Sequence, residues 1–186
     1  MTAPVCLSES LTAKVWPHAV IPNPDLVFVG DGVVIDDFVL IVARKPIILA
    51  DGVHIGCGSS ILGGEAVRIG EGTSLSAGVR IFTATEDLDG LFGPSAPDSC
   101  RIALRAPVEI GAHVLIGANS VVLPGARIGR GAVVGALSMV PTWAKLDEWT
   151  VYGGVPVREL RPRNRQPVGL AMHIMQEEGL LWEYQR

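Results

Sequence analysis

Three sets of side chains in this chain have the types and spacing that chemistry requires. Glu86 and Asp87 are adjacent carboxylates, which can bind and orient a cationic or polyhydroxylated ligand or accept a proton from it. His113 is a second candidate base, because imidazole exchanges a proton near pH 7. Near the C-terminus four cations fall within one short stretch of a chain whose net charge is −4, and this density favours phosphate recognition: Arg158, Arg161, Arg163 and Arg165.

The elements that position these residues are predicted by a six-residue repeat. Each hexad is expected to form one short strand and one turn, and three hexads close one coil of a triangular prism of about five coils. The pattern therefore predicts an all-β protein, a three-sided parallel β-helix. The aliphatic residues expected to fill the prism are Val29, Ile35, Ile41, Leu49, Ile55, Ile61, Ile69, Leu75, Ile81, Ile110, Ile116, Val122, Ile128, Val134 and Val140. Small residues expected beside the corners are Val114, Ser120, Ala126, Ala132 and Ser138.

Other segments lie outside the repeat. Residues 82–108 interrupt it and are predicted to leave the prism as an ejected loop, a type of insertion that usually serves function. Residues 1–26 are expected to cap the first coil, so that the β-helix spans 27–142. The remaining segment, 143–186, is predicted to exit the prism and end in a helix over 168–185. The expected apolar side of that helix carries Leu170, Ile174, Leu181 and Trp182.

The hexads, the loop and the exit segment together resemble the hexapeptide-repeat acyltransferases, especially the small sugar acetyltransferases. This resemblance covers residues 27–163 and implies a left-handed β-helix. Members of that family are homotrimers that bind acetyl-CoA between neighbouring prisms, with the acceptor held beside the ejected loop. The resemblance therefore implies acetyl-CoA as co-substrate. It also implies that the acceptor is an amino or hydroxyl group of a sugar or nucleotide-sugar.

The resemblance also implies roles for individual residues. The family's loop carries a histidine that deprotonates the acceptor, whereas this chain has Glu86 at that position. Glu86 and Asp87 are therefore predicted to line the acceptor site, with Glu86 as base and His113 as the alternative base. Val155 replaces the asparagine of the family's exit motif and removes a hydrogen-bonding side chain. Donor binding is expected on later coils and the exit segment, at Gly117, Ala118, Ala136, Ser138, Pro156, Arg158, Arg161 and Arg163.

Two other functions are compatible with the repeat. A structural or assembly subunit without activity would explain the missing histidine and the altered exit motif. A zinc enzyme similar to the hexapeptide-repeat carbonic anhydrases is suggested by His54 and His113. These two histidines belong to different coils and different places in the hexad, so a single zinc ion could not easily join them within one chain. No metal is therefore expected.

Composition excludes further classes of function. No apolar run reaches the ~18 residues of a membrane-spanning helix, and no signal-like segment opens the chain, which favours a cytoplasmic protein without membrane contact. The net charge of −4 argues against general nucleic-acid binding. Cys6, Cys57 and Cys100 are widely spaced and odd in number, so reduced thiols are expected instead of a disulfide framework.

Overall fold

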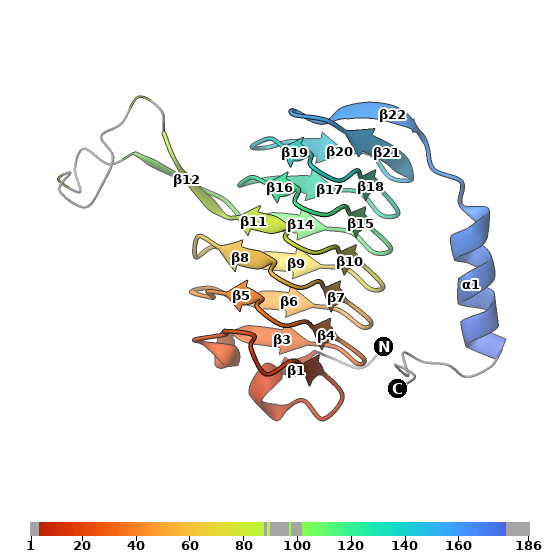
Figure 1. Ribbon diagram of the computed structural model, residues 1–186, viewed down its shortest axis with the longest axis horizontal. Coiled ribbons are helices and arrows are strands. Elements are labelled where there is room, and N and C mark those ends of the chain that lie inside the picture. The colour runs from red at the N-terminus through yellow and green to blue at the C-terminus, as the bar shows by residue number, and fades with distance from the viewer. Residues whose placement is uncertain (1–3, 88, 90–96, 98–101, 178–186) are drawn as a thin grey trace.

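The computed structural model describes residues 4–87, 89, 97 and 102–177, and their backbone forms a three-sided parallel β-helix (Figure 1). One coil shows the plan, because the chain passes through β3 (Val27–Val29), β4 (Val34–Ile35) and β5 (Leu40–Ile41) in turn, one strand on each side. Equivalent strands of the next coil pair with these in parallel 20 residues further on, as Ile35 pairs with Ile55. The predicted coil of three hexads is confirmed.

Each side of the prism is one sheet, here named A, B or C. In the described residues the parallel strands of sheet A are β3, β6 (Ile47–Leu49), β9 (Val67–Ile69), β14 (Val108–Ile110), β17 (Arg127–Ile128) and β20 (Lys145–Leu146). Those of sheet B are β2 (Lys14–Val15), β4, β7 (His54–Ile55), β10 (Ser74–Leu75), β15 (Leu115–Ile116), β18 (Val133–Val134) and β21 (Thr150–Gly153). Sheet C contains β5, β8 (Ser60–Leu62), β11 (Arg80–Phe82), β16 (Val121–Val122) and β19 (Met139–Val140). The chain therefore turns at three kinds of corner, A–B, B–C and C–A.

The core is the column of inward side chains on each sheet. All fifteen aliphatic residues predicted to fill the prism are buried, with at most 3% of the surface of each exposed. The five small residues predicted beside the corners are buried as well. Side chains of this kind contribute about 1.5–3 kcal/mol each when fully buried, so the columns hold the coils in register.

The solenoid is longer than expected at both ends. β2 pairs in parallel with β4, although it lies within the segment 1–26 that was expected to be a cap. The expected exit after residue 142 is also wrong, because Leu146 and Tyr152 continue the six-residue spacing and are buried at the inward positions of β20 and β21. A tyrosine is accommodated there because its hydroxyl accepts a hydrogen bond from the Asp147 N–H, at 2.9 Å. Short elements also frame the first coil: β1 (Val5–Cys6), η1 (Leu7–Glu9) and η2 (Pro24–Leu26).

The segment predicted to leave the prism, 82–108, overlaps the sheets at both ends, because Phe82 belongs to β11 and Val108 to β14. Its base is a hairpin of two antiparallel strands, β12 (Ala84–Glu86) and β13 (Ala103–Arg105). Figure 1 shows this hairpin projecting away from the prism, and it leaves from a C–A corner.

Past the last coil, β22 (Arg158–Pro162) runs antiparallel to β21 and leads to α1 (Gln166–Glu177). The helix starts two residues before the predicted position because the Asn164 side chain caps it, its Oδ1 accepting a hydrogen bond from the Gln166 N–H at 3.0 Å. The expected apolar side is wrong, since Leu170 and Ile174 are exposed and Leu181 and Trp182 lie outside the described residues. Val168, Met172 and Met175 face the prism instead. Within the described part of the chain, no helix is long and apolar enough to cross a bilayer.

Candidate active site

The hairpin holds the two candidate acids at the end of β12. Glu86 pairs with Ala103 across the hairpin and is exposed to solvent. Asp87 is half-buried, and its Oδ1 accepts a hydrogen bond from the Asp89 N–H at 2.9 Å. A carboxylate used in this way fixes the turn that follows the strand. The described residues therefore place the acids at the end of a strand and leave Glu86 exposed to solvent.

His113 lies in the turn between β14 and β15, at an A–B corner. Its φ of 56° is the left-handed conformation that this turn requires, and glycine takes the equivalent place at Gly72 and Gly131. The His113 side chain is buried, and its Nε2 makes no hydrogen bond to any residue that the structure describes. Burial lowers the pKa of His113, and Arg130 and Arg163 lower it further, whereas Glu71 opposes them. The imidazole is therefore neutral at pH 7 and can accept a proton.

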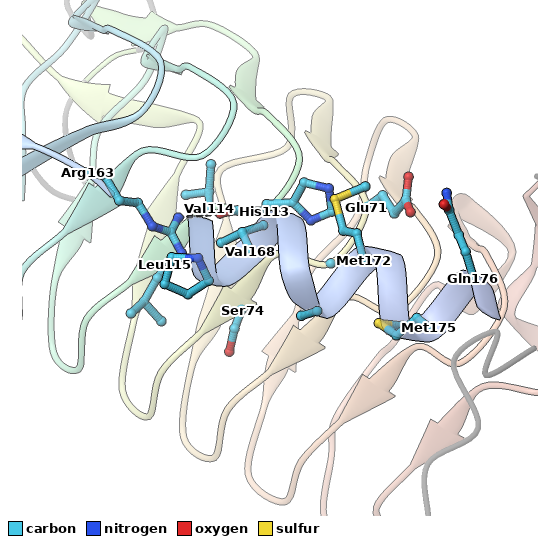
Figure 2. Close-up of a pocket in the computed structure, with 13 residues that line it drawn as sticks. Glu71, Ser74, His113, Val114, Leu115, Arg163, Val168, Met172, Met175 and Gln176 are labelled. Atoms are coloured by element: carbon cyan, nitrogen blue, oxygen red, sulfur yellow. Dashed lines mark hydrogen bonds between the residues drawn. The ribbon is translucent and has the colours of Figure 1, made fainter. Parts of the chain in front are cut away.

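A cleft of about 510 Å³ lies beside His113, between sheet B and α1. Figure 2 shows α1 crossing this corner, with Val168 and Met172 on the same side of the helix as His113. Arg163 and Glu71 line the cleft on opposite sides of His113 (Figure 2). This cleft was not predicted, because it depends on how α1 packs against coils far away in the sequence.

Arg163 has a docking role that the sequence did not reveal. Its Nη1 donates hydrogen bonds to the carbonyl oxygens of His113 and Gly131, at 2.7 and 2.9 Å. The guanidinium carbon also lies 5.8 Å from the centroid of the Trp149 ring, and that of Arg165 lies 5.2 Å from it. These contacts fasten the exit segment to the A–B corner. To bind a phosphate, the Arg163 guanidinium would have to share or give up these contacts. Phosphate binding by Arg163 therefore stays a prediction.

The residues expected to bind the donor lie at a different corner. Gly117, Ala118, Ala136 and Ser138 belong to the turns between sheets B and C. A Cβ on Gly117 would lie 2.3 Å from the Ala136 backbone nitrogen, so only glycine permits the coils to stack here. The Ser138 hydroxyl is already engaged, accepting a hydrogen bond from the Gly154 N–H at 3.0 Å and donating one to the Ala136 carbonyl at 3.3 Å. It anchors the exit turn to the last full coil.

The exit turn and β22 are open to solvent. Pro156 is exposed after a cis Val155–Pro156 bond, and Arg158 and Arg161 are exposed on β22. The Arg161 Nη1 donates to the Pro162 carbonyl at 3.1 Å. Arg158 has no hydrogen-bond or ion-pair partner within the described ranges, so its charge is available to a ligand.

The candidate groups therefore occupy three different corners of one prism. Glu86 and Asp87 lie at a C–A corner, His113 at an A–B corner and the expected donor residues at B–C corners. Figure 1 shows the hairpin and α1 on opposite sides of the molecule. A single chain does not bring these groups together. The sequence could have revealed this separation, because counting hexads from each break in the repeat gives the corner at which a residue lies.

Histidines elsewhere in the chain are paired with carboxylates. His54 Nε2 lies 3.0 Å from Asp36 Oδ2, and His18 Nδ1 lies 3.0 Å from Asp37 Oδ1. In the portion of the chain that the structure describes, no three His, Cys, Asp or Glu side chains form a group that could hold a metal ion.

Comparison with known proteins identifies the family. Residues 107–142 match the model described as bacterial transferase hexapeptide, six repeats. The chain is 33% identical over 145 residues to dTDP-4-amino-4,6-dideoxy-D-glucose acyltransferase of Escherichia coli, covering 76% of this chain and 74% of the relative. The chain belongs to the hexapeptide-repeat acyltransferases. Its fold is the left-handed parallel β-helix that the resemblance implied.

Two further similarities place this acyltransferase among those that modify sugars. The N-acyltransferase AntD from Bacillus cereus, solved with dTDP and 3-hydroxybutyryl-CoA, superposes with a TM-score of 0.82 at 30% identity, covering 90% of this chain and 88% of AntD. A putative lipopolysaccharide biosynthesis O-acetyl transferase, WbbJ of Escherichia coli strain K12, is 38% identical over 78 residues, which is 42% of this chain and 39% of WbbJ.

Proposed function

We propose that this protein transfers an acyl group from acyl-CoA to an amino group of a nucleotide-linked sugar. One observation carries the proposal: the similarity to AntD and to the Escherichia coli amino-sugar acyltransferase extends over most of each chain. The similarity to the O-acetyl transferase covers less than half of either chain. The longer similarity favours nitrogen over oxygen as the acylated atom.

The reaction needs an uncharged amine and a group that accepts the proton that the amine loses. The amine nitrogen attacks the thioester carbonyl, the C–N bond forms, the C–S bond breaks, and CoA leaves as the thiol while the nitrogen loses a proton. Glu86 and Asp87 bind and orient the acceptor nitrogen. Glu86 takes the proton that the nitrogen loses, and this proton passes on to the sulfur of the departing CoA, so that the carboxylate is restored. An amine attacks without prior deprotonation by a strong base once it is neutral, so a glutamate in place of histidine is compatible with this acceptor.

We propose that the donor binds along the B–C corner. Ala118 and Ala136 have small side chains, which leaves backbone accessible to the pantetheine arm. Gly117 contributes by letting the two coils that carry them stack closely. Arg158 and Arg161 supply exposed positive charge for the phosphates, and Pro156 and Ser138 shape the exit turn between them.

We further propose that the active molecule is a homotrimer with its sites between chains. The candidate groups lie at three corners of one prism, so a neighbouring chain must supply those that its partner lacks. The outward side chains of sheet A are charged in its upper coils, as in Arg68, Arg127 and Lys145, and therefore suit solvent. The B–C corner instead exposes 70% of Leu137 and 68% of Val155, apolar surface that a second copy would cover.

A cytoplasmic location is part of the same proposal. Cys6 and Cys57 are free thiols, as is usual in a reducing compartment, and Cys100 lies outside the described residues. Cell fractionation with a periplasmic marker tests the location.

The test of function is an acylation assay with purified protein. Acetyl-CoA and 3-hydroxybutyryl-CoA are each offered with dTDP-4-amino-4,6-dideoxyglucose and with its 4-hydroxy counterpart, and product is identified by mass spectrometry. We expect amide formation with the amino sugar alone. Glu86→Gln and Asp87→Asn should each reduce turnover at least tenfold, with acyl-CoA binding unchanged.

Two results would overturn the proposal. If millimolar acyl-CoA does not raise the melting temperature, the protein lacks the donor site and a structural role becomes the better account. If sedimentation gives a monomer at micromolar concentration, the shared site is wrong. Leu137→Glu should dissociate the trimer and abolish turnover together, whereas Phe38→Glu, at the equivalent exposed place in the first coil, should do less to both.

A further inference from the structure

A hollow at the base of the hairpin is built from three successive C–A corners. Its volume is about 270 Å³, and its lining includes Arg44 from the first coil, Gly63 and Gly64 from the second, and Ala84 and Arg105 from the hairpin. None of these residues was a candidate from the sequence. The hollow lies outside the B–C corner assigned to the donor and outside the cleft beside His113.

The floor of the hollow is a turn of fixed geometry. Gly63 and Gly64 have φ values of 116° and 86°, which side-chain-bearing residues rarely adopt. Thr83 holds the turn from within the protein, because its buried hydroxyl accepts a hydrogen bond from the Glu65 N–H at 2.9 Å and donates one to the Leu62 carbonyl at 3.2 Å. The open backbone at the two glycines is therefore an enforced feature of this corner.

This turn offers unused hydrogen-bond donors. The N–H groups of Gly63 and Gly64 donate to no acceptor in the described residues. Consecutive main-chain N–H groups in such a turn form a concavity that binds anions. A Cβ on Gly63 would lie 2.5 Å from the Ala84 nitrogen, so only glycine lets this turn pack directly beneath the start of the hairpin.

Two arginines border the same turn. The Arg105 Nη1 donates to the Gly63 carbonyl at 3.1 Å, which holds that guanidinium over the hollow. The stem of Arg44 packs against Gly64, where an added Cβ would lie 3.0 Å from the Arg44 Cδ. Arg44 has no hydrogen-bond or ion-pair partner within the described part of the chain. Two guanidinium groups and two free N–H groups are the donor set that a diphosphate requires.

The hairpin also sets the distance from this hollow to Glu86. Arg105 pairs with Ala84, and Glu86 lies two residues further along β12, so Arg105 and Glu86 occupy the same face of the hairpin. Two residues of strand span about 6.6–6.8 Å. One pyranose ring, from the substituent on C1 to the substituent on C4, fits within that length. Ala84 and Ala103 lie between the two charged groups and leave room for the ring.

We infer that Arg44, Arg105 and the Gly63–Gly64 turn bind the diphosphate of the nucleotide-linked acceptor, with the amino group of its sugar held at Glu86. This inference rests on the proposed function and names the part of the acceptor that gives it affinity. The diphosphate anchors the sugar at one end, and the acidic end of β12 receives the amine at the other. A free amino sugar would lack the anchor and bind weakly.

The test measures binding of dTDP by calorimetry and turnover of dTDP-4-amino-4,6-dideoxyglucose. Arg44→Met keeps the stem that packs on Gly64 and removes the charge, and Arg44→Met/Arg105→Met removes both charges. Arg127→Met is the control, because it removes an exposed charge from the outer face of sheet A, where Arg127 lies 3.7 Å from a Glu109 carboxylate oxygen. We expect dTDP to bind at least tenfold more weakly to Arg44→Met and still more weakly to the double variant. Acyl-CoA binding and the control should be unchanged.

Turnover of free 4-amino-4,6-dideoxyglucose separates binding from folding. The variants should acylate this sugar at the rate of the unmodified protein, which shows that the hairpin is intact. If the unmodified protein binds dTDP and both variants bind it equally well, the diphosphate site is wrong and the proposed function stands. If the unmodified protein binds acyl-CoA but neither binds dTDP nor acylates the nucleotide sugar, the proposed acceptor is wrong and the inference fails with it.

Discussion

Replacement of Arg163 by methionine tests whether this residue docks the exit segment. The variant loses two hydrogen bonds from Nη1, to the carbonyls of His113 and Gly131, and the stacking on Trp149. Hydrogen bonds to a charged group contribute about 1.5–3 kcal/mol each, and partial exposure reduces that value, so we expect a loss of about 2–3 kcal/mol. Because β22 and α1 hold on to the coils through this contact, the loss should appear there first.

The assay is hydrogen exchange of peptides that cover residues 163–177. A loss of 2–3 kcal/mol corresponds to amide exchange that is roughly 30- to 150-fold faster in α1. The matched control is Arg165→Met, two residues away, which removes the same charge and a contact with the same ring but no hydrogen bond to the coils. Its effect should stay below about 1 kcal/mol. Unchanged exchange in Arg163→Met, or equal effects in the two variants, would refute the docking role.

Three further predictions concern stability and pH. Gly117→Ala should lower the free energy of unfolding by more than about 2 kcal/mol in thermal melts, because its Cβ would strike the Ala136 backbone. Gly58→Ala is the control, because a Cβ there meets open space and should cost only about 1 kcal/mol from the positive φ. Similar melting temperatures for the two variants would contradict the stacking argument. Since burial lowers the pKa of His113 below its unfolded value, the unfolded chain binds the proton more tightly and stability falls as pH drops below about 6.5. His113→Asn should flatten that part of the stability profile, and an unchanged slope between pH 7.5 and 5.5 would count against it. Ile55→Ala, in the fully buried column of sheet B, should lose about 2–5 kcal/mol in denaturant titrations, and a loss well under 1 kcal/mol would mean that the column is not the core.

The C-terminal helix shows where sequence periodicity was insufficient. Its apolar residues surround much of the helix, so choosing Leu170 and Ile174 as the buried side was a matter of spacing alone. The structure turns Val168, Met172 and Met175 toward sheet B because Arg163 and Trp149 fix where the chain leaves the last coil. The direction of the exit segment, and not the helix pattern, decides which side is covered.

The candidate active-site residues divide in the same way. Glu86 and Asp87 were found because they interrupt a repeat, and an interruption is visible in the sequence. Arg44 and Arg105 were missed because they are far apart in the chain and each is an ordinary surface arginine by itself. Only the stacking of three C–A corners places both of them beside Gly63 and Gly64.

By itself the sequence determined the β-helix, its three sides, the identity of the core residues and the place where the hairpin leaves. It could do so because each hexad makes its strand and turn from local residues, and the six-residue period alone decides which side chain points inward. Tertiary structure decided that Arg163 fastens the exit segment, that His113 becomes buried and neutral, and that a cation-lined hollow forms at the base of the hairpin. Those features depend on contacts between residues tens of positions apart, whose geometry is set by how coils and α1 pack and not by any local pattern.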